Sequence, residues 1–365
     1  MPNYLMIILL LGMGILGIRY SGENPPMFFD MREEYRQAVH SQEIFTWPGA
    51  DSLLEHRLEL LSNEKGEPLL FYSNIYTPVC VDGACKPMYI EIYWNLIGSY
   101  VGYGTIEQEP LTKFDHELFA EADYVRLHHL LQDKNSILKR KQLSDLFDPN
   151  ASPGEKITIQ GVKVDAVSGA TKREIKESVV EGALYSCFTI WHLVHGVVRE
   201  EMSRYIDSVY NPDIARYFLH SDYEEYQFYA IKHMDSLALE QSLPRVLEIY
   251  QLSKPLTRTF ILKKLSREMW KRPWVGEQLY QSFSNVDISS QTMLVNRLPD
   301  ADPGVVPVLA TQGRVMTQNQ LKAYLQYLGE NPESITPTLK TALVSVAADP
   351  NYAYGYLIKA FLQDH

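Results

Sequence analysis

The stretch DAVSGATKREI, residues 165 to 175, places several residue types that can do chemistry close together. A carboxylate, Asp165, precedes a turn of small residues, and the hydroxyl of Thr171 follows where a helical pattern begins. Gly169 permits a tight turn, because glycine adopts backbone conformations that other residues rarely reach. Thr171 is therefore either the cap of the following helix or a residue to which a group is attached.

The capping interpretation needs only ordinary local structure. The sequence Thr171-Lys172-Arg173-Glu174 fits a capping box, in which the Thr side chain accepts from one backbone N–H and the Glu side chain reaches back to another. Asp165 would then accept hydrogen bonds from turn amides. On this interpretation the stretch only connects a strand to a helix.

The attachment interpretation comes from a resemblance. The positions that match the pattern D-x-x-S/T-G-A-T/S are Asp165, Ser168, Gly169, Ala170 and Thr171. The pattern resembles the flavin-attachment sequence of the FMN-binding domain family, which includes the covalent-FMN subunits of the sodium-pumping quinone reductase and the Rnf electron-transport complex. In that family the last hydroxyl forms a phosphoester with FMN, installed outside the cytoplasm by a dedicated magnesium-dependent flavin transferase. The resemblance implies covalent FMN on Thr171, with a flavin transferase as a partner.

The physics of a helix start suits this linkage, although the resemblance is partial. A phosphate at the first turn of a helix lies against unpaired backbone N–H groups and the positive end of the dipole. Lys172 and Arg173 stand where the family commonly has further small hydroxyl residues, and two cations beside a phosphodiester are electrostatically favourable. The resemblance covers about residues 65 to 200, and the C-terminal part has no counterpart in the classical members.

Two cysteines form a second candidate site. In CVDGAC, Cys80 and Cys85 flank an Asp-Gly turn signal, and a hairpin there brings the two sulfurs within reach of a disulfide. Three interpretations stay open: a structural disulfide, a redox pair that exchanges electrons with the flavin, and a loosely spaced zinc pair.

Two histidines and a set of aromatic residues could either pack in the core or bind a metal or the flavin. His192 and His195 lie on one helical face and could ligate a metal, but Trp191 and Val194 beside them indicate a packed helix. No metal site is predicted. A further set of aromatic residues is interpreted first as sheet core and second as flavin neighbours: Tyr89, Tyr93, Trp94, Tyr100 and Tyr103.

The N-terminus indicates export. Residues 4 to 18, YLMIILLLGMGILGI, are apolar and uncharged, which is short for a membrane-spanning helix of about 20 residues but typical of a signal sequence. We expect residues 1–26 to be a signal peptide or an N-terminal membrane anchor. An extracytoplasmic location, periplasmic or in the cell envelope, follows from this interpretation.

The elements before the motif are predicted from periodicity. Residues 31–45 and 51–63 have apolar residues at spacings of three and four and predict two helices. Residues 68–107 are rich in Tyr, Ile and Val with turn signals, and predict several antiparallel strands. Residues 112–133 predict a helix, and residues 155–168 a further strand pair that leads into the motif.

Beyond Thr171 the pattern is helical throughout. One apolar stripe predicts a single long helix, open to a break near Gly196. The stripe consists of Ile175, Val179, Ala183, Cys187, Trp191, Val194, Val198 and Met202. From about Pro212 onward, eight or nine amphipathic segments of roughly ten to fifteen residues suit an α-solenoid of the HEAT type or an irregular helical bundle.

These patterns together predict an α+β protein, with an antiparallel-sheet domain at residues 27–205, which the resemblance implies to be of the FMN-binding type, and then an all-α, repeat-like domain at 212–365. The net charge of −11, without a long basic run, excludes a nucleic-acid footprint. The favoured hypothesis is an exported, membrane-associated electron-transfer flavoprotein, a substrate of the transferase rather than a self-contained enzyme. The cofactor would supply the redox chemistry. The alternatives are an envelope scaffold that binds a partner and carries no cofactor, and a thiol oxidoreductase that uses the cysteine pair.

Overall fold

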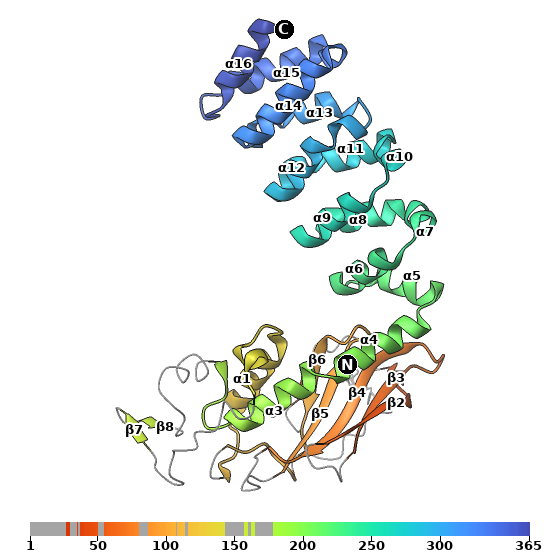
Figure 1. Cartoon of the computed structure of the whole chain (residues 1–365), viewed down its shortest axis with the longest axis vertical. Helices are drawn as coiled ribbons and strands as arrows, with labels where there is room; N and C mark the ends of the chain where they lie inside the picture. The colour runs from red at the N-terminus through yellow and green to blue at the C-terminus, as the bar shows by residue number, and fades with distance from the viewer. Residues whose placement is uncertain are drawn as a thin grey trace, which may run out of the picture. The chain divides into compact units, whose positions relative to one another are not determined.

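The computed structural model describes residues 27–29, 35, 37–49, 55–79, 87–106, 108–113, 116–142, 157–159, 162–164 and 178–365. The chain divides into two compact units, Met1–Tyr210 and Asn211–His365, which we call unit 1 and unit 2. Unit 1 contains all the described strands, and unit 2 is helical. The predicted α+β class, with an antiparallel sheet and a mostly helical C-terminal part, is confirmed (Figure 1).

A six-stranded antiparallel sheet forms the centre of unit 1, with the strand order β1-β6-β5-β4-β3-β2. Its strands are β1 (Met27–Phe29), β2 (His40–Pro48), β3 (Glu55–Ser62), β4 (Pro68–Thr77), β5 (Met88–Trp94) and β6 (Tyr100–Gly104). Consecutive strands from β2 to β6 are neighbours, so the topology is a meander. The strands predicted within residues 68–107 are confirmed as β4, β5 and β6.

Helices pack on one face of this sheet, which we call the helix-covered face. They are α1 (Glu121–Gln132), α3 (Leu184–His195) and α4 (Val198–Val209). The Trp94 indole of β5 donates to the Val194 carbonyl of α3 at 2.9 Å, and the Phe71 ring of β4 meets Tyr205 of α4 edge-on with centroids 6.0 Å apart. Figure 1 shows α3 and α4 running across the sheet. The helix predicted within residues 112–133 is confirmed as α1.

The prediction of helices at residues 31–45 and 51–63 is wrong for the parts that the structure describes as His40–Pro48 and Glu55–Ser62. His40–Pro48 and Glu55–Ser62 are the strands β2 and β3, which pair with each other. In β3 buried and exposed residues alternate, with His56, Leu58 and Leu60 buried. A run of several leucines fits spacings of two as well as three and four, and pairing with β2 and β4 selects the strand.

The predicted single long helix beyond Thr171 is also corrected. Glu181 and Gly182 form a turn, with Gly182 at a φ of 76°, and only then does α3 begin at Leu184. A second break at Gly196 separates α3 from α4, as the sequence had left open. The buried stripe itself is confirmed from Val179 to Met202, because both helices turn the same apolar face to the core.

Unit 2 consists of twelve α-helices and several short 3-10 turns. The α-helices are α5 (Pro212–His220), α6 (Glu224–His233), α7 (Ser236–Gln241), α8 (Leu243–Leu252), α9 (Pro255–Lys264), α10 (Arg267–Trp270), α11 (Pro273–Gln281), α12 (Ile288–Asn296), α13 (Val305–Thr311), α14 (Gln318–Glu330), α15 (Pro337–Ala347) and α16 (Gly355–Asp364). This number exceeds the predicted eight or nine segments, because helices as short as the four residues of α10 carry too little periodicity to detect. Every residue of unit 2 is described, and none lies in a strand.

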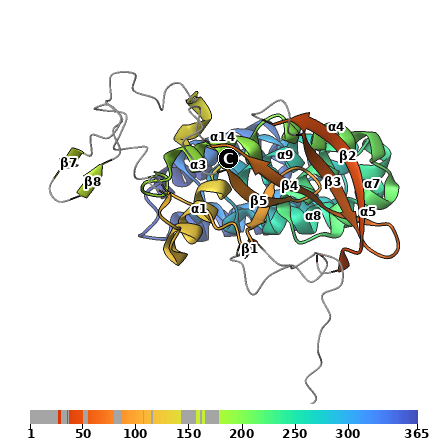
Figure 2. The ribbon, with the colours of Figure 1, turned by 90° about the horizontal axis from the view of Figure 1, so that it is seen from below.

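The helices of unit 2 form two rows (Figure 1). Helices α8, α11, α13 and α15 contact one another in succession, and so do α9, α12, α14 and α16. Figure 2 views the same array from below. The arrangement is that of a solenoid, in which each helix pair covers the apolar face of the next.

Side-chain hydrogen bonds reveal the repeat length of this array. Gln312 Nε2 donates to the Tyr280 carbonyl at 2.6 Å, and Gln320 Nε2 donates to the Ile288 carbonyl at 3.2 Å; each bond spans 32 residues. The Lys264 ammonium bonds the Lys232 carbonyl across the same 32 residues. This step is shorter than the roughly 40 to 47 residues of HEAT repeats.

Candidate functional site

The predicted attachment residues lie outside the described residues. These are Asp165, Ser168, Gly169, Ala170 and Thr171. The preceding strand pair is described: β7 (Ile157–Ile159) and β8 (Val162–Val164) form an antiparallel hairpin, as predicted. β8 ends at the residue before Asp165, so the chain enters the motif directly from a strand.

The predicted cysteine pair, Cys80 and Cys85, also lies outside the described residues. The third cysteine, Cys187 of α3, is a buried free thiol. Burial raises the pKa of Cys187 to about 12, so this thiol stays protonated at neutral pH. It accepts from the Val180 amide at 3.4 Å and acts as part of the core.

His192 and His195 have a structural role. His192 Nε2 bonds the Leu138 carbonyl at 3.1 Å, and His195 Nε2 bonds the Leu131 carbonyl at 2.9 Å. The Trp191 indole between them donates to the Asp133 carbonyl at 3.0 Å. These three side chains of α3 hold the C-terminal end of α1 and the turn after it, so the packed-helix interpretation is the one the structure supports.

The predicted aromatic set separates by sheet face. Trp94 and Tyr103 are fully buried on the helix-covered face, where the Tyr103 hydroxyl donates to the Tyr124 carbonyl of α1 at 2.9 Å. Tyr89 and Tyr93 of β5 point to the other face, which we call the open face, because their cross-strand partners there are Tyr76 and Tyr72. Tyr93 is fully buried as well, so the core interpretation is confirmed for Tyr93, Trp94 and Tyr103.

The open face carries a cluster that the sequence reasoning missed. The Glu91 carboxylate accepts hydrogen bonds from three phenols: Tyr72 at 3.2 Å, Tyr89 at 3.0 Å and Tyr93 at 3.0 Å. In β5 the sequence YIEIY places two of these tyrosines two residues on either side of Glu91, and strand alternation puts all three on one face. The spacing of Tyr89, Glu91 and Tyr93 was therefore a signal for this cluster in the sequence. Tyr72 comes close to Glu91 only through the register of β4 against β5.

This arrangement favours the protonated form of the Tyr72 and Tyr89 phenols. Burial first, and the Glu91 charge second, raise the pKa of Tyr72 and of Tyr89 well above the ordinary value for tyrosine. The Asn74 side chain acts on the pKa of Tyr89 in the opposite direction. The cluster is thus a set of phenol donors around one carboxylate.

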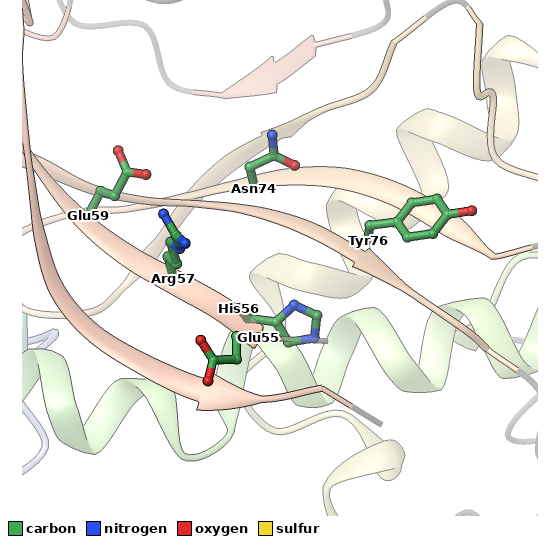
Figure 3. Close-up of a pocket in the computed structure, with 6 residues that line it drawn as sticks. All are labelled: Glu55, His56, Arg57, Glu59, Asn74 and Tyr76. Carbon is green, nitrogen blue, oxygen red and sulfur yellow. The ribbon is translucent and has the colours of Figure 1, made fainter. Parts of the chain in front are cut away.

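A hollow of about 340 Å³ opens over β3 and β4 (Figure 3). Its lining residues are Glu55, His56, Arg57, Glu59, Asn74 and Tyr76. The first four come from β3 and the last two from β4 (Figure 3). His56 is 3% exposed, and its imidazole meets the Trp47 ring with centroids 5.4 Å apart.

The described residues contain no group of three or more His, Cys, Asp or Glu side chains arranged to hold a metal ion. Among the helices described, none has the length and apolar character needed to cross a membrane. Comparison of the chain with models of protein families, with characterised proteins and with solved structures gives no match.

Proposed function

We propose that the protein is an exported flavoprotein that carries FMN covalently on Thr171 and acts in extracytoplasmic electron transfer. The motif DAVSGAT carries this proposal, because it combines the hydroxyl, carboxylate and small residues of a flavin-attachment sequence. The β7–β8 hairpin supports it, since a strand leads directly into Asp165. The apolar run at residues 4 to 18 supports an extracytoplasmic location, either released or anchored in the membrane.

The residue types in the motif suit covalent attachment of FMN. Thr171 offers a hydroxyl for the phosphoester, and Ser168 and Asp165 offer a donor and an acceptor nearby. Gly169 and Ala170 leave room for the transferase and then for the isoalloxazine ring. Lys172 and Arg173 would balance the charge of the phosphodiester. The bound flavin would supply the redox chemistry, and the protein would tether it and set its electrostatic surroundings.

Intact-mass spectrometry of the exported protein, produced with an active flavin transferase, tests the proposal. We expect the mass to rise by one FMN less one water, because forming the phosphoester removes the hydrogen of the Thr171 hydroxyl and one hydroxyl group of the FMN phosphate. Thr171→Ala should stay unmodified and Thr171→Ser should retain the modification. Ser168→Ala is the matched control, because it removes the neighbouring hydroxyl but leaves the attachment residue.

An unmodified wild-type mass, with the transferase shown active on a known acceptor, would leave Thr171 as a helix cap. The scaffold hypothesis would then lead, with unit 2 as the partner-binding part. The observation that favours it is a series of exposed apolar residues in the first turns of α9, α12 and α16: Leu256, Ile288 and Tyr356. Photo-crosslinking in cells from position 288, with position 326 as control, would show whether this series meets a partner.

A further inference from the structure

Unit 2 exposes apolar side chains at the corners where a helix of one row is followed by a helix of the other row. These corners lie between α8 and α9, α11 and α12, α13 and α14, and α15 and α16. Each corner carries at least one apolar side chain that is about half exposed or more. We call these residues together the apolar edge: Leu252 (87% exposed), Leu256 (75%), Ile288 (64%), Val315 (46%) and Tyr356 (57%).

Contacts between the elements show that the corners adjoin one another in this order. Helix α9 contacts α12, which joins the first corner to the second. Gln320 Nε2 of α14 donates to the Ile288 carbonyl at 3.2 Å, which joins the second to the third. Gln318 Nε2 of α14 donates to the Tyr356 hydroxyl of α16 at 3.1 Å, which joins the third to the fourth. The exposed apolar side chains therefore form one row along unit 2, whereas singly scattered apolar residues are ordinary on any surface.

Two arginines at the apolar edge are already paired. Arg258 Nη1 lies 3.6 Å from the Asp287 carboxylate, and Arg314 Nε lies 3.2 Å from the Asp349 carboxylate. Each pair joins one corner to the next, so these charges hold the array together. They leave the apolar side chains between them as the groups that face solvent.

The charge of unit 2 favours a partner surface that is itself close to neutral. Unit 2 has 15 Lys and Arg residues against 16 Asp and Glu residues, so most of the net charge of −11 belongs to unit 1. Binding to an anionic membrane draws on free cations beside apolar residues. The exposed Lys254 at the first corner instead has its ammonium 4.0 Å from the Glu224 carboxylate. The apolar edge of a second copy is a surface with the required character.

A second copy also matches the spacing of the apolar edge. Leu256 and Ile288 are 32 residues apart, which is the step of the hydrogen bonds between neighbouring helix pairs. Packed helices lie about 8–10 Å apart, so apolar side chains recur along the edge at roughly that interval. Two copies related by a two-fold axis present the same interval to each other, as an isologous interface requires.

We propose that two copies of the protein associate through the apolar edge of unit 2, with the exposed apolar side chains of one copy packed against those of the other. Removing these side chains from water supplies the driving force. The inference names the partner of the surface on which the scaffold alternative rests. It does not depend on flavin attachment at Thr171.

Photo-crosslinking in cells tests the proposal with two differently tagged copies of the full-length chain. A photoreactive residue in place of Ile288 in one copy should give a product that carries both tags, crosslinked to a residue of the apolar edge in the other copy. Val315→Glu in both copies should reduce this product about fivefold or more, because a carboxylate would have to be buried in an apolar interface.

Position 237 is the matched control for crosslinking. Leu237 of α7 is also 64% exposed, but it follows the C-terminal end of α6, which adjoins the C-terminal end of α9 through the bond from Lys264 to the Lys232 carbonyl. The apolar edge meets α9 at its N-terminal end instead. A photoreactive residue at position 237 should therefore give no product with both tags.

Sedimentation velocity of the exported protein gives the second measurement. We expect the wild type to self-associate with a Kd on the order of 10 μM, and Ile288→Glu to raise this Kd roughly tenfold or more. Leu237→Glu should leave the Kd unchanged, and unchanged melting temperatures would show that the variants fold.

The proposal is overturned if no product carries both tags, if positions 237 and 288 give it equally, or if position 288 crosslinks to a different protein instead. It is also overturned if Ile288→Glu and Leu237→Glu associate as the wild type does. The intact mass reports on Thr171 separately, so either proposal can fail while the other stands.

Discussion

At the residue scale, the described side chains that looked most reactive divide into core and surface groups. His192 and His195 join α3 to α1 and the segment after it inside unit 1, and Cys187 is a buried core thiol. The side chains with solvent access and convergent polar groups lie on the open face of the sheet instead. Residue type alone could not separate these two sets, because the same imidazole serves as a ligand or as a hydrogen-bond donor according to what its neighbours offer.

The Glu91 cluster gives a prediction about tyrosine ionisation. Glu91→Gln removes a charge that opposes formation of phenolate at Tyr72 and Tyr89, so we expect both pKa values to fall while they stay above the ordinary value because burial persists. Spectrophotometric titration of the phenolate band measures this. Glu43→Gln removes a carboxylate of the same sheet that bonds no tyrosine, and it should leave these titrations in place.

His195 gives a prediction about stability and pH. Burial lowers its pKa from 6.5 to about 4 in the folded protein, so between these values the unfolded chain binds more protons than the folded one. Its contribution to stability is therefore fully present above pH 6.5 and is lost as the pH falls toward 4. His192, His56 and His128, whose pKa values are lowered by burial too, contribute with the same sign.

We expect His195→Gln to depend less on pH than the wild type across this window. Urea titrations followed by hydrogen exchange of α3 measure the stability of unit 1 alone. His40→Gln, which removes an exposed imidazole of β2, is the matched control. If the stability of the His195 variant depended on pH as strongly as that of the wild type, His195 would not be a source of this pH dependence.

At the element scale, short connections fix where the strands and helices meet. Asn95 Oδ1 accepts from the Ile97 and Ser99 amides in the turn between β5 and β6, and Gly98 completes this turn with a φ of 73°. Gly98-Ser99 is one of the turn signals that predict strand connections within residues 68–107. The structure adds that the turn packs against α4, because a Cβ on Gly98 would lie 3.2 Å from Arg199 Cγ.

Alanine variants of two glycines distinguish the stability cost of a strained backbone from the cost of close packing. Gly66 has a similar φ of 77° but open space around a Cβ, so Gly66→Ala should cost only the left-handed conformation, about 1 kcal/mol. Gly98→Ala adds contacts with Arg199 and Met202 and should cost more. The difference in urea midpoint between the two variants measures the packing of the turn on α4. An equal decrease of the urea midpoint in both variants would show that the side chains of α4 move aside for the added methyl group at no cost in stability.

At the scale of the whole molecule, the two units follow different rules of assembly. The sheet of unit 1 depends on pairing among strands from β1 to β6, whereas unit 2 grows by contacts between neighbouring helix pairs. In such an array stability is close to a sum of repeat terms and nearest-neighbour terms. The hydrogen bonds that span 32 residues are part of the neighbour terms.

A variant of Gln312 tests whether neighbouring helix pairs of unit 2 stabilise one another. Gln312→Ala removes the bond to the Tyr280 carbonyl and the bond accepted from the Ser284 amide at 2.9 Å, at a cost of about 1–3 kcal/mol. We expect faster hydrogen exchange in α11 and α13 and little change in unit 1. Gln326→Ala, which removes only an exposed bond to Glu330 within α14, is the control. Uniform destabilisation of all unit 2 helices would instead indicate one cooperative block.

The sequence by itself determined the α+β class, the strands from β4 to β6, the hairpin before Asp165 and the helical character beyond Pro212, since these depend on local periodicity and turn residues. The tertiary structure decided that His40–Pro48 and Glu55–Ser62 are strands, because the pairing of β2 with β3 and of β3 with β4 overrides the helical spacing of their apolar residues. It also decided where α3 begins and which side chains gather around Glu91 and at the hollow. Those sites join residues from different strands, and their proximity is set by register, which no local pattern specifies.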